Sequence, residues 1–287
     1  MSIKKHGWLI YREEDAKRNE RFIKLLFSAA EKRNLSLSLI TLEQFSWNIT
    51  NGPALFQKKT VADPDFLLNR SISHWVNELA EYKNIPVMNS SFISRMANDK
   101  RMAHVYFRTK KIPMLETVAA TSQSLKNSPF SYPFVIKNPY GRGGGGVHFI
   151  KSRQELNEKL SMEKNTEWLV QPIAGQPGKD LRVYIVGNEI KGAVLRESSS
   201  SKELRANIST GGTSRLYELS DTEKELVEEM CKDIRIDFAG IDFLFAENGE
   251  LLFNEMEDAV GCRSLYMNSS IDIADLFMDY IKHTFFT

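Results

Sequence analysis

Residues 238–258, FAGIDFLFAENGELLFNEMED, decide how the second half of this chain folds. Residues 243–245 and 251–253 are short apolar runs typical of β-strands. Asn248 and Gly249 stand between them, and Asn-Gly is the strongest short hairpin signal, because both residues tolerate the positive φ angles of a tight turn. The stretch therefore predicts an antiparallel β-hairpin.

The predicted hairpin brings acidic side chains together. With Asn248-Gly249 as the two loop residues, Glu247 pairs with Glu250, and counting outward sets Asp242 opposite Glu255. Glu257 then lies two residues on, along the same face as Glu255. Opposed like charges destabilise a sheet, so this register predicts a bound cation, with Mg²⁺ or Mn²⁺ as the ions that oxygen ligands suit. The alternative is a solvated hairpin whose acids point to water.

Composition sets limits on the function. The 287 residues are 42% hydrophobic and 26% charged, with a net charge of +1, so no global charge favours nucleic acid or an anionic membrane as a partner. Cys231 and Cys262 lie far apart and in no CxxC pattern, which argues against a disulfide scaffold or a structural zinc site. No apolar run reaches transmembrane length, and the apolar segment near the start is short for a signal peptide. We expect a cytoplasmic protein.

Hydrophobic patterning divides the chain. The first ninety or so residues alternate strand and helix, which predicts a small α/β domain with a parallel sheet. Its predicted strands are residues 7–11, 35–40, 66–68 and 85–88, and its predicted helices are 13–33 and 73–82. Later predicted strands are 117–120, 133–137, 147–150, 167–171, 181–186 and 189–195, and later predicted helices are 99–111, 153–163, 221–234 and 271–284. Ser152 and Glu155 have the spacing of a capping box before the helix at 153–163.

A glycine-rich loop at residues 140–146, YGRGGGG, follows the predicted strand 133–137. Successive glycines let backbone N–H groups approach an anion closely, as in loops that hold polyphosphate. The loop is not a Walker A motif, and it leads into a strand rather than a helix, which excludes the dinucleotide fingerprint. It is a candidate phosphate cover with Lys137 at its entrance, and the alternative is a plain flexible hairpin.

The second half carries several arginines but no nucleophile constellation. Arg182, Arg196, Arg205 and Arg263 can each clamp a carboxylate or phosphate, although most surface arginines do not. None of the five histidines has metal-ligand spacing, and there is no GxSxG elbow. This pattern favours phosphoryl transfer, which depends on positioning and electrostatics rather than on a covalent side chain.

These segments together resemble the ATP-grasp superfamily, most closely its branch of ribosomal-protein-modifying glutamate ligases (RimK type) and LysW–aminoadipate ligases. The resemblance runs from about residue 85 to the end and is carried by six places. They are residues 98–100 (NDK), 132–137 (YPFVIK) with the glycine loop, 169–173 (LVQPI), 178–183 (GKDLRV), 204–212 (LRANISTGG), and 240–242 (GID) with 254–257 (NEME).

The resemblance implies an α/β (α+β) chain with an ATP-grasp fold behind an N-terminal Rossmann-like domain. The implied parts are 1–95, the pre-ATP-grasp domain; 96–172, the small subdomain with the phosphate loop; and 173–287, the C-terminal subdomain with the metal site. ATP contacts are expected from Lys100, Lys137, Gly143, Gly144, Gly145, Gln171, Pro172, Ile173, Asp180, Arg205, Ala206 and Asn207. Catalytic roles are expected for Arg182, Arg205 and Asn207, and Mg²⁺ or Mn²⁺ ligation for Asp242, Glu255 and Glu257.

The chain departs from the family pattern at four places. Pro172 stands where the family usually has Glu, so the adenine contact there is limited to its carbonyl. Thr210 replaces an arginine before two glycines, and Glu257 replaces an asparagine as third metal ligand. Residues 258–266, DAVGCRSLY, replace a Ser-Ser-Pro-Gly run in a region where relatives select amino-acid substrates.

The activity that the resemblance implies is ATP- and Mg²⁺-dependent ligation of a carboxylate to an amine. The reaction passes through an acyl phosphate and releases ADP and phosphate. The expected substrates are an amino acid, a peptide or a carrier protein, and a homo-oligomer is left open. Two alternatives remain: an ATP-grasp kinase acting on a hydroxyl group, and a nucleotide-binding protein without catalysis.

Overall fold

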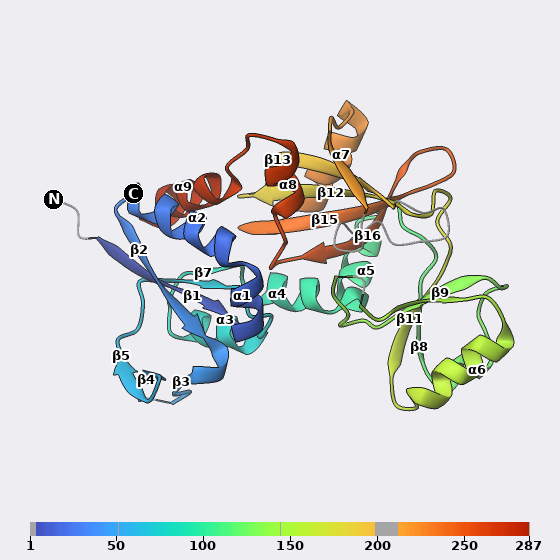
Figure 1. Ribbon diagram of the computed structural model, residues 1–287, viewed down its shortest axis with the longest axis horizontal. Helices are drawn as coiled ribbons and strands as arrows, with labels where there is room; N and C mark the ends of the chain where they lie inside the picture. Colours follow the sequence, from blue (N-terminus) through green and yellow to red (C-terminus); the bar gives the residue numbers. More distant parts are fainter. Residues whose placement is uncertain (1–3, 51, 144, 199–211, 287) are drawn as a thin grey trace.

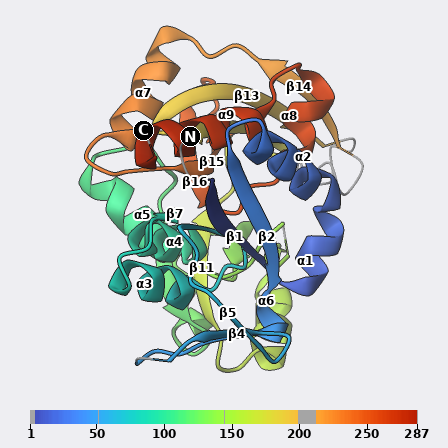
Figure 2. The ribbon, with the colours of Figure 1, turned by 90° about the vertical axis from the view of Figure 1, so that its left-hand side faces the viewer.

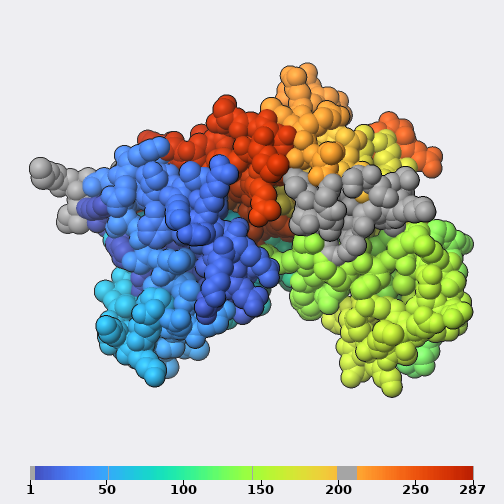
Figure 3. Space-filling model, viewed as in Figure 1, coloured from blue at the N-terminus to red at the C-terminus, as the bar shows by residue number. Residues whose placement is uncertain are grey.

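The computed structural model describes residues 4–50, 52–143, 145–198 and 212–286. Mixed α/β structure runs through these residues, as the sequence predicts. An N-terminal domain and a middle subdomain form two lobes, and the C-terminal subdomain lies across both of them (Figure 1). The same two lobes are distinct on the molecular surface (Figure 3).

The N-terminal domain contains the parallel sheet that strand–helix alternation predicts. Its strand order is β2-β1-β6-β7, and every pairing in it is parallel. The strands are β1 (Lys5–Tyr11), β2 (Leu35–Thr41), β6 (Phe66–Asn69) and β7 (Val87–Met88). The helices of this domain are α1 (Glu13–Arg18), α2 (Glu20–Glu31) and α3 (His74–Tyr82).

Three local features of the first hundred residues differ from the prediction or were missed by it. The single helix predicted at 13–33 is two helices, because the backbone of Asn19 (φ −106°, ψ 16°) leaves the helical conformation and its side-chain amide donates to the carbonyl of Asp15. A small antiparallel sheet and one helix were not predicted. These are β3 (Phe45–Trp47), β4 (Ala54–Phe56) and β5 (Lys59–Val61), preceded by the 3₁₀ turn η1 (Leu42–Gln44), and α4 (Ser91–Asn98).

The middle subdomain is an antiparallel sheet covered by one helix. Its strand order is β10-β9-β11-β8. The elements are β8 (Val118–Thr121), η2 (Ser124–Lys126), β9 (Phe134–Lys137), β10 (Val147–Ile150), α6 (Arg153–Met162) and β11 (Glu167–Pro172). Ser152 caps α6 as predicted, its hydroxyl accepting from the Glu155 N–H, whereas the Glu155 carboxylate accepts from the N–H of Lys151.

The C-terminal subdomain is built on a five-stranded antiparallel sheet of order β14-β13-β12-β15-β16. Its strands are β12 (Lys179–Val186), β13 (Glu189–Glu197), β14 (Thr213–Tyr217), β15 (Phe238–Phe245) and β16 (Leu251–Glu257). Its helices are α7 (Asp221–Cys231), α8 (Arg263–Asn268) and α9 (Ile273–Phe285). The preceding helix α5 (Lys100–Thr109) and α4 pack against β16.

Two hydrophobic cores sandwich this sheet. Helices α4, α5 and α7 cover one face, where Phe107 and Phe253 are fully buried in contact. Helices α8 and α9 cover the other face, and α2 of the N-terminal domain packs alongside α9 (Figure 2). The second core is therefore continuous across two parts of the chain that are far apart in sequence.

The hairpin β15–β16 reaches the predicted pairing by a different route. Its loop has three residues, because the N–H of Ala246 donates to the carbonyl of Glu250, and Gly249 adopts a left-handed φ of 88°. That shifts the register by one residue from the prediction. A β-bulge at Asn254 shifts it back, so Asp242 does pair with Glu255.

No helix among the described residues is long and apolar enough to cross a membrane. The domain boundaries predicted at 95/96 and 172/173 stay predictions.

Candidate active site

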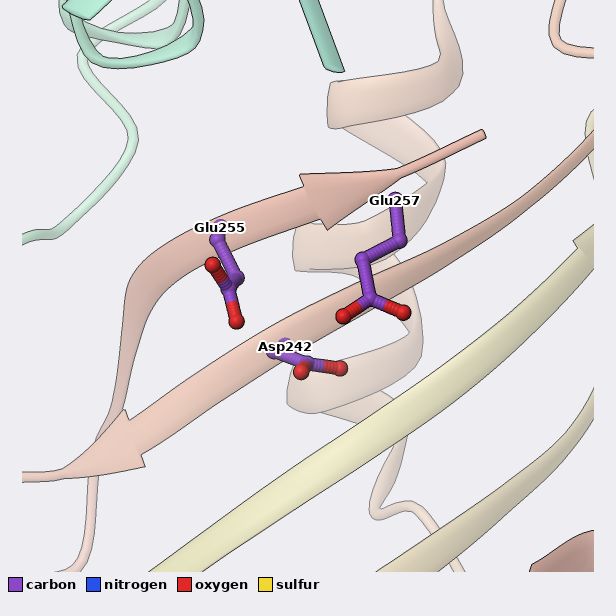
Figure 4. Close-up of side chains that lie close together, drawn as sticks. All are labelled: Asp242, Glu255 and Glu257. Carbon is purple, nitrogen blue, oxygen red and sulfur yellow. The ribbon is translucent and has the colours of Figure 1, made fainter. Parts of the chain in front are cut away.

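Three carboxylates from the hairpin converge at one point. Asp242 lies on β15, Glu255 and Glu257 lie on β16, and one oxygen of each lies within 4.8 Å of the others. Figure 4 shows the three side chains pointing toward one another. Asp242 is only 1% exposed. The alternative of a hairpin whose acids face water is therefore wrong.

Arginines from the neighbouring strands partly neutralise this cluster. Arg182 lies directly opposite Asp242, to which its Nε and Nη2 donate at 2.7 and 2.6 Å, and its Nη2 also lies 3.0 Å from Glu257. Arg196 donates from Nη2 to Asp242 at 2.8 Å and pairs through Nε with Asp180. The arrangement is a buried network in which each acid shares a cation.

The two innermost acids have opposite shifts in pKa. Burial alone would raise the pKa of Asp242, but Arg182 and Arg196 outweigh it and hold that pKa below its usual value. Burial raises the pKa of Glu257, which Arg182 lowers and Asp242 and Glu255 raise further. The cluster thus carries more carboxylate charge than its arginines compensate, which a divalent cation would relieve.

Two lysines face the acids from the opposite side of the cleft. Lys137, at the end of β9, donates to Asn254 Oδ1 at 2.7 Å. Lys100, the first residue of α5, lies 2.8 Å from Glu255 and also donates to the carbonyl of Gly141. Burial lowers the pKa of Lys137 to about 8, and Lys100 lowers it further while Glu255 opposes the change.

The glycine loop connects β9 to β10 and turns over the lysines. Gly143 and Gly146 have φ values of 58° and 79°, which favour glycine. A Cβ at Gly141 would lie 2.4 Å from the carbonyl oxygen of Gly145. Gly144 lies outside the described residues. The backbone path therefore requires glycine at positions 141, 143 and 146, and strand β10 rather than a helix follows the loop.

One cavity of about 270 Å³ joins these groups. Lys100, Lys137, Glu255 and Glu257 line it together with the glycine loop, and the end of β11 with Asp180 closes its other side. Pro172 at the end of β11 and Ile173 directly after it also line the cavity. Ten of the predicted residues thus share one cavity: Lys100, Lys137, Gly143, Gly145, Gln171, Pro172, Ile173, Asp180, Glu255 and Glu257.

The side-chain amide of Gln171 is engaged in hydrogen bonds within the protein. Its amide donates to Thr117 Oγ1 at 2.8 Å and lies 3.1 Å from His104 Nε2, so only its Oε1 has no partner. Burial raises the pKa of Asp180 to about 6, while Arg196 lowers it. Arg182 and Asp242 do not line the 270 Å³ cavity and stand behind Glu257.

Four predicted positions of the nucleotide and acyl-phosphate site are not among the described residues. Arg205, Ala206 and Asn207, and the departure at Thr210, lie in the stretch 199–211, outside the described residues.

Sequence reasoning missed three contributors to the site. Arg196 was seen only as a possible clamp, although Asp180 lies directly opposite it across β12–β13. Asn254, the bulge residue, holds Lys137. Arg142 ties the glycine loop to Asp258 at 3.1 Å and to Asn98 at 2.5 Å. A strand register for β12–β13 would have revealed the first of these; the other two depend on contacts between distant segments.

The comparison with known proteins agrees with this geometry. Residues 97–281 match the model of the RimK-like ATP-grasp domain. Among curated proteins, an uncharacterized protein of Mycoplasma genitalium, MG011, is 26% identical over 88% of this chain and 83% of its own length. The Glutamate–LysW ligase ArgX of Sulfurisphaera tokodaii is 24% identical over 91% of this chain and 94% of its own length.

Solved structures show the same fold. The RimK domain ATP-grasp protein of Sphaerobacter thermophilus superimposes with a TM-score of 0.71 and 15% identity, over 96% of this chain and 99% of that one. At this identity the likeness concerns the fold alone. Together with the family match over residues 97–281, it shows that the chain has an ATP-grasp fold.

Proposed function

The chain belongs to the family of RimK-like ATP-grasp domains, and from this premise we propose that it is an ATP- and Mg²⁺-dependent carboxylate–amine ligase that works through an acyl phosphate. The main support is that a single cavity joins two lysines and a glycine loop to Glu255 and Glu257, two members of the cluster of three carboxylates. Cations that hold phosphates and acids that hold a metal are the two parts that phosphoryl transfer requires.

We place ATP in this cavity with its adenine at the end of β11 and its phosphates at the two lysines. The adenine would lie against the backbone at the end of β11, where Pro172 lacks an N–H and offers only its carbonyl. Asp180 would approach the ribose. The phosphates would lie between Lys100, Lys137 and the loop around Gly143 and Gly145, because these line the cavity together next to Glu255. Gly144, Arg205, Ala206 and Asn207 are proposed contacts by resemblance alone.

The three carboxylates fit a divalent metal. An all-oxygen donor set within 4.8 Å suits Mg²⁺ or Mn²⁺, and the ligands are acids that arginines only partly neutralise. Asp242, Glu255 and Glu257 would hold the ion. When bound, it would act as a Lewis acid toward the phosphates and neutralise charge that develops during transfer.

The residues of the chain would do the rest of the chemistry. A substrate carboxylate attacks the γ-phosphorus, the bond to ADP breaks, and Lys100 and Lys137 stabilise the transferring phosphoryl group. Arg182, within reach of Glu257, would orient the acid cluster and the reacting carboxylate. An amine then attacks the acyl carbon, phosphate leaves and the amine loses a proton. Arg142 would help to keep water out by tying the glycine loop down on Asp258.

The substrates proposed are an amino acid, a peptide or an amino acid joined to a carrier protein. The similarity to a ligase named for glutamate and LysW supports a carboxylate substrate and leaves the acceptor open.

The test is a screen for ADP and phosphate release with Mg-ATP across amino acids and short peptides, singly and in pairs. We expect at least one pair to release ADP and phosphate in amounts equal to the amide formed. ATP binding without substrate-stimulated ADP release from any pair would contradict an enzymatic role. ADP release with a phosphorylated hydroxyl product would make the protein a kinase.

A further inference from the structure

Residues 139–142, where the glycine loop begins, are tied to the junction between α4 and α5. Three of these ties hold the base of the loop. They are a hydrogen bond from the Lys100 N–H to the carbonyl of Pro139 at 3.1 Å, one from Arg101 Nη2 to the hydroxyl of Tyr140 at 2.6 Å, and one from Lys100 Nζ to the carbonyl of Gly141. The fourth tie is made by the side chain of Arg142 and reaches further.

Arg142 joins two polar side chains next to the acid cluster. Its Nη2 donates to Asn98 Oδ1 at 2.5 Å and lies 3.1 Å from Asp258 Oδ1, and the Asn98 amide lies 3.2 Å from Asp258 Oδ2. Asp258 directly follows Glu257, is buried, and also accepts from the N–H of Ala259. We call Arg142, Asn98 and Asp258 the loop clamp. Because its carboxylate is shielded from water, the clamp is a strong, charge-assisted contact.

The loop clamp lies where two cavities meet. A second cavity, of about 660 Å³, is lined by Arg142 together with Arg182 and Glu257. Gly143, the next residue of the loop, lines both this cavity and the 270 Å³ cavity. Arg142 is the only charged residue in the loop sequence, residues 140–146. It alone can therefore hold the loop through an ion pair.

The glycine loop must move for a nucleotide to enter. Gly141, Gly143 and Gly145 form part of the wall of the 270 Å³ cavity. Cavities for drug-sized ligands enclose roughly 300–1,000 Å³, so this cavity is small for ATP and its wall has to shift outward. The clamp fixes the loop to the end of α4 and to the residue after β16, which are not part of the loop. An outward movement of the loop therefore requires Arg142 to leave Asp258.

We propose that Arg142 is a positioning residue that gates the nucleotide cavity, and that the loop opens only when Arg142 leaves Asp258. The clamp has the same partners before and after a nucleotide enters, so it slows entry and release alike and has little effect on affinity. Asp258 is the first residue of the stretch 258–266 that departs from the family pattern, so the gate belongs to this chain's own sequence. The inference rests on the proposed function for the nature of the ligand, but the clamp itself can be tested without one.

The rates of entry and release are measured by stopped-flow fluorescence on the full chain, with Mg²⁺ and ADP that carries a methylanthraniloyl group on its ribose. Arg142→Met loses a charge-assisted hydrogen bond and should raise the association and dissociation rate constants about tenfold each, with Kd within about twofold of the wild type. Arg142→Lys keeps the charge but loses the planar fork, and it should have a smaller effect.

Asp258→Asn tests the other end of the clamp. It should raise both rate constants, and the double variant Arg142→Met/Asp258→Asn should be no faster than Arg142→Met, because both changes break one contact. Arg153→Met is the matched control, since Arg153 is an exposed arginine at the start of α6 in the same subdomain. It should keep the rate constants of the wild type.

Hydrogen exchange of the loop amides, followed by mass spectrometry without nucleotide, reports opening of the loop directly. Asp258→Asn leaves the loop sequence unchanged, so its exchange can be compared with that of the wild type peptide by peptide. The peptide that contains residues 139–146 should exchange several times faster in Asp258→Asn than in the wild type. In Arg153→Met its exchange should not change.

Three results would overturn the gate. The first is a pair of rate constants in Arg142→Met within about twofold of the wild type. The second is a higher Kd with an unchanged association rate constant, which would make Arg142 a direct phosphate contact. The third is loop exchange in Asp258→Asn equal to that of the wild type. A protein that binds no nucleotide but shows the expected exchange would instead refute the ligase function and leave the gating of the cavity intact.

Discussion

At the scale of single residues, charge pairing distinguishes the site from an ordinary acidic hairpin. The sequence predicted that Asp242, opposed by Glu255, needs a cation, and in the structure Arg182 and Arg196 reach it directly. The predicted opposition of Asp242 and Glu255 was therefore correct. The prediction did not include the arginines, which supply part of the positive charge that the acids need. Which arginines do so depends on sheet order, and local sequence does not reveal that order.

Glu257 tests how much the third acid contributes. Asn at this position would still offer one oxygen ligand but would remove a charge next to Arg182 and Asp242. We expect Glu257→Asn to raise the Mg²⁺ concentration needed for half-maximal ADP release, with turnover at saturating Mg²⁺ staying within about tenfold of the wild type. Complete loss of turnover at saturating Mg²⁺ would mean that the charge of Glu257 has a role beyond metal binding.

Lys137 should control ATP affinity. A charge-assisted hydrogen bond is worth about 1.5–3 kcal/mol, so Lys137→Met should weaken ATP binding about 10- to 100-fold by calorimetry. In the proposed site the charged form of Lys137 binds the phosphates, and its pKa is lowered to about 8. ATP affinity of the wild type should therefore fall as pH rises through 8, and this dependence should be absent in the variant.

Lys126→Met is the control for Lys137, since Lys126 is exposed on the same subdomain. It should bind ATP as the wild type does. Equal affinity of Lys137→Met and Lys126→Met would count against a phosphate role for Lys137.

At the scale of elements, the hairpin shows how a correct pairing can follow from an incorrect register. A two-residue turn was predicted, and the chain instead has a three-residue loop and a bulge whose shifts cancel. The Asn-Gly sequence favours a turn by local preference alone. The bulge depends on a contact with a distant segment, because the bulge residue Asn254 accepts a hydrogen bond from Lys137. The break at Asn19 has a local origin, because a side-chain amide competes for a backbone carbonyl.

Helix α5 is joined to β16 and β11 through His104. Its Nδ1 faces the carbonyl of Lys100 at 2.8 Å, and a carbonyl only accepts, so Nδ1 carries the proton and Nε2 accepts from the amide of Gln171. The ring packs on Phe253 at 5.2 Å. Burial lowers the pKa of His104 to about 4, and Lys137 lowers it further. The imidazole is therefore neutral at pH 7.

The low pKa of the buried His104 predicts that the fold loses stability in acid. The pKa of His104 in the unfolded chain is about 6.5, so between pH 6.5 and 4 the unfolded state binds more protons and stability falls as pH falls. From pH 6.5 to 5 the loss should be about 2 kcal/mol, measured as the free energy of unfolding in urea. His104→Gln should lack this part of the pH dependence, and His74→Gln, at an exposed histidine, should keep it. The same pH dependence in both variants would contradict the assignment.

At the scale of the whole molecule, periodicity predicted the α/β class and most strands, and motif order predicted the family. Ten predicted residues meet in one cavity because strand ends of two subdomains face each other there. What the sequence did not reveal lies between domains: the packing of α2 on α9, the tie from Arg142 to Asp258, and the buried Arg70. These contacts join segments more than a hundred residues apart, and no local pattern encodes them.

Formation of an acyl phosphate at the acid cluster can be tested by adding hydroxylamine in place of the amine, because hydroxylamine traps the acyl phosphate as a hydroxamate. The wild type, given Mg-ATP and a carboxylate that stimulates ADP release, should form hydroxamate and ADP in equal amounts. Glu255→Gln should form neither while remaining folded by circular dichroism, because it loses a proposed metal ligand and the partner of Lys100. Glu250→Gln, at an exposed acid of the same hairpin, should behave as the wild type. Stimulated ADP release without hydroxamate would contradict an acyl-phosphate intermediate. Hydroxamate formation by Glu255→Gln at the rate of the wild type would contradict the role proposed for Glu255.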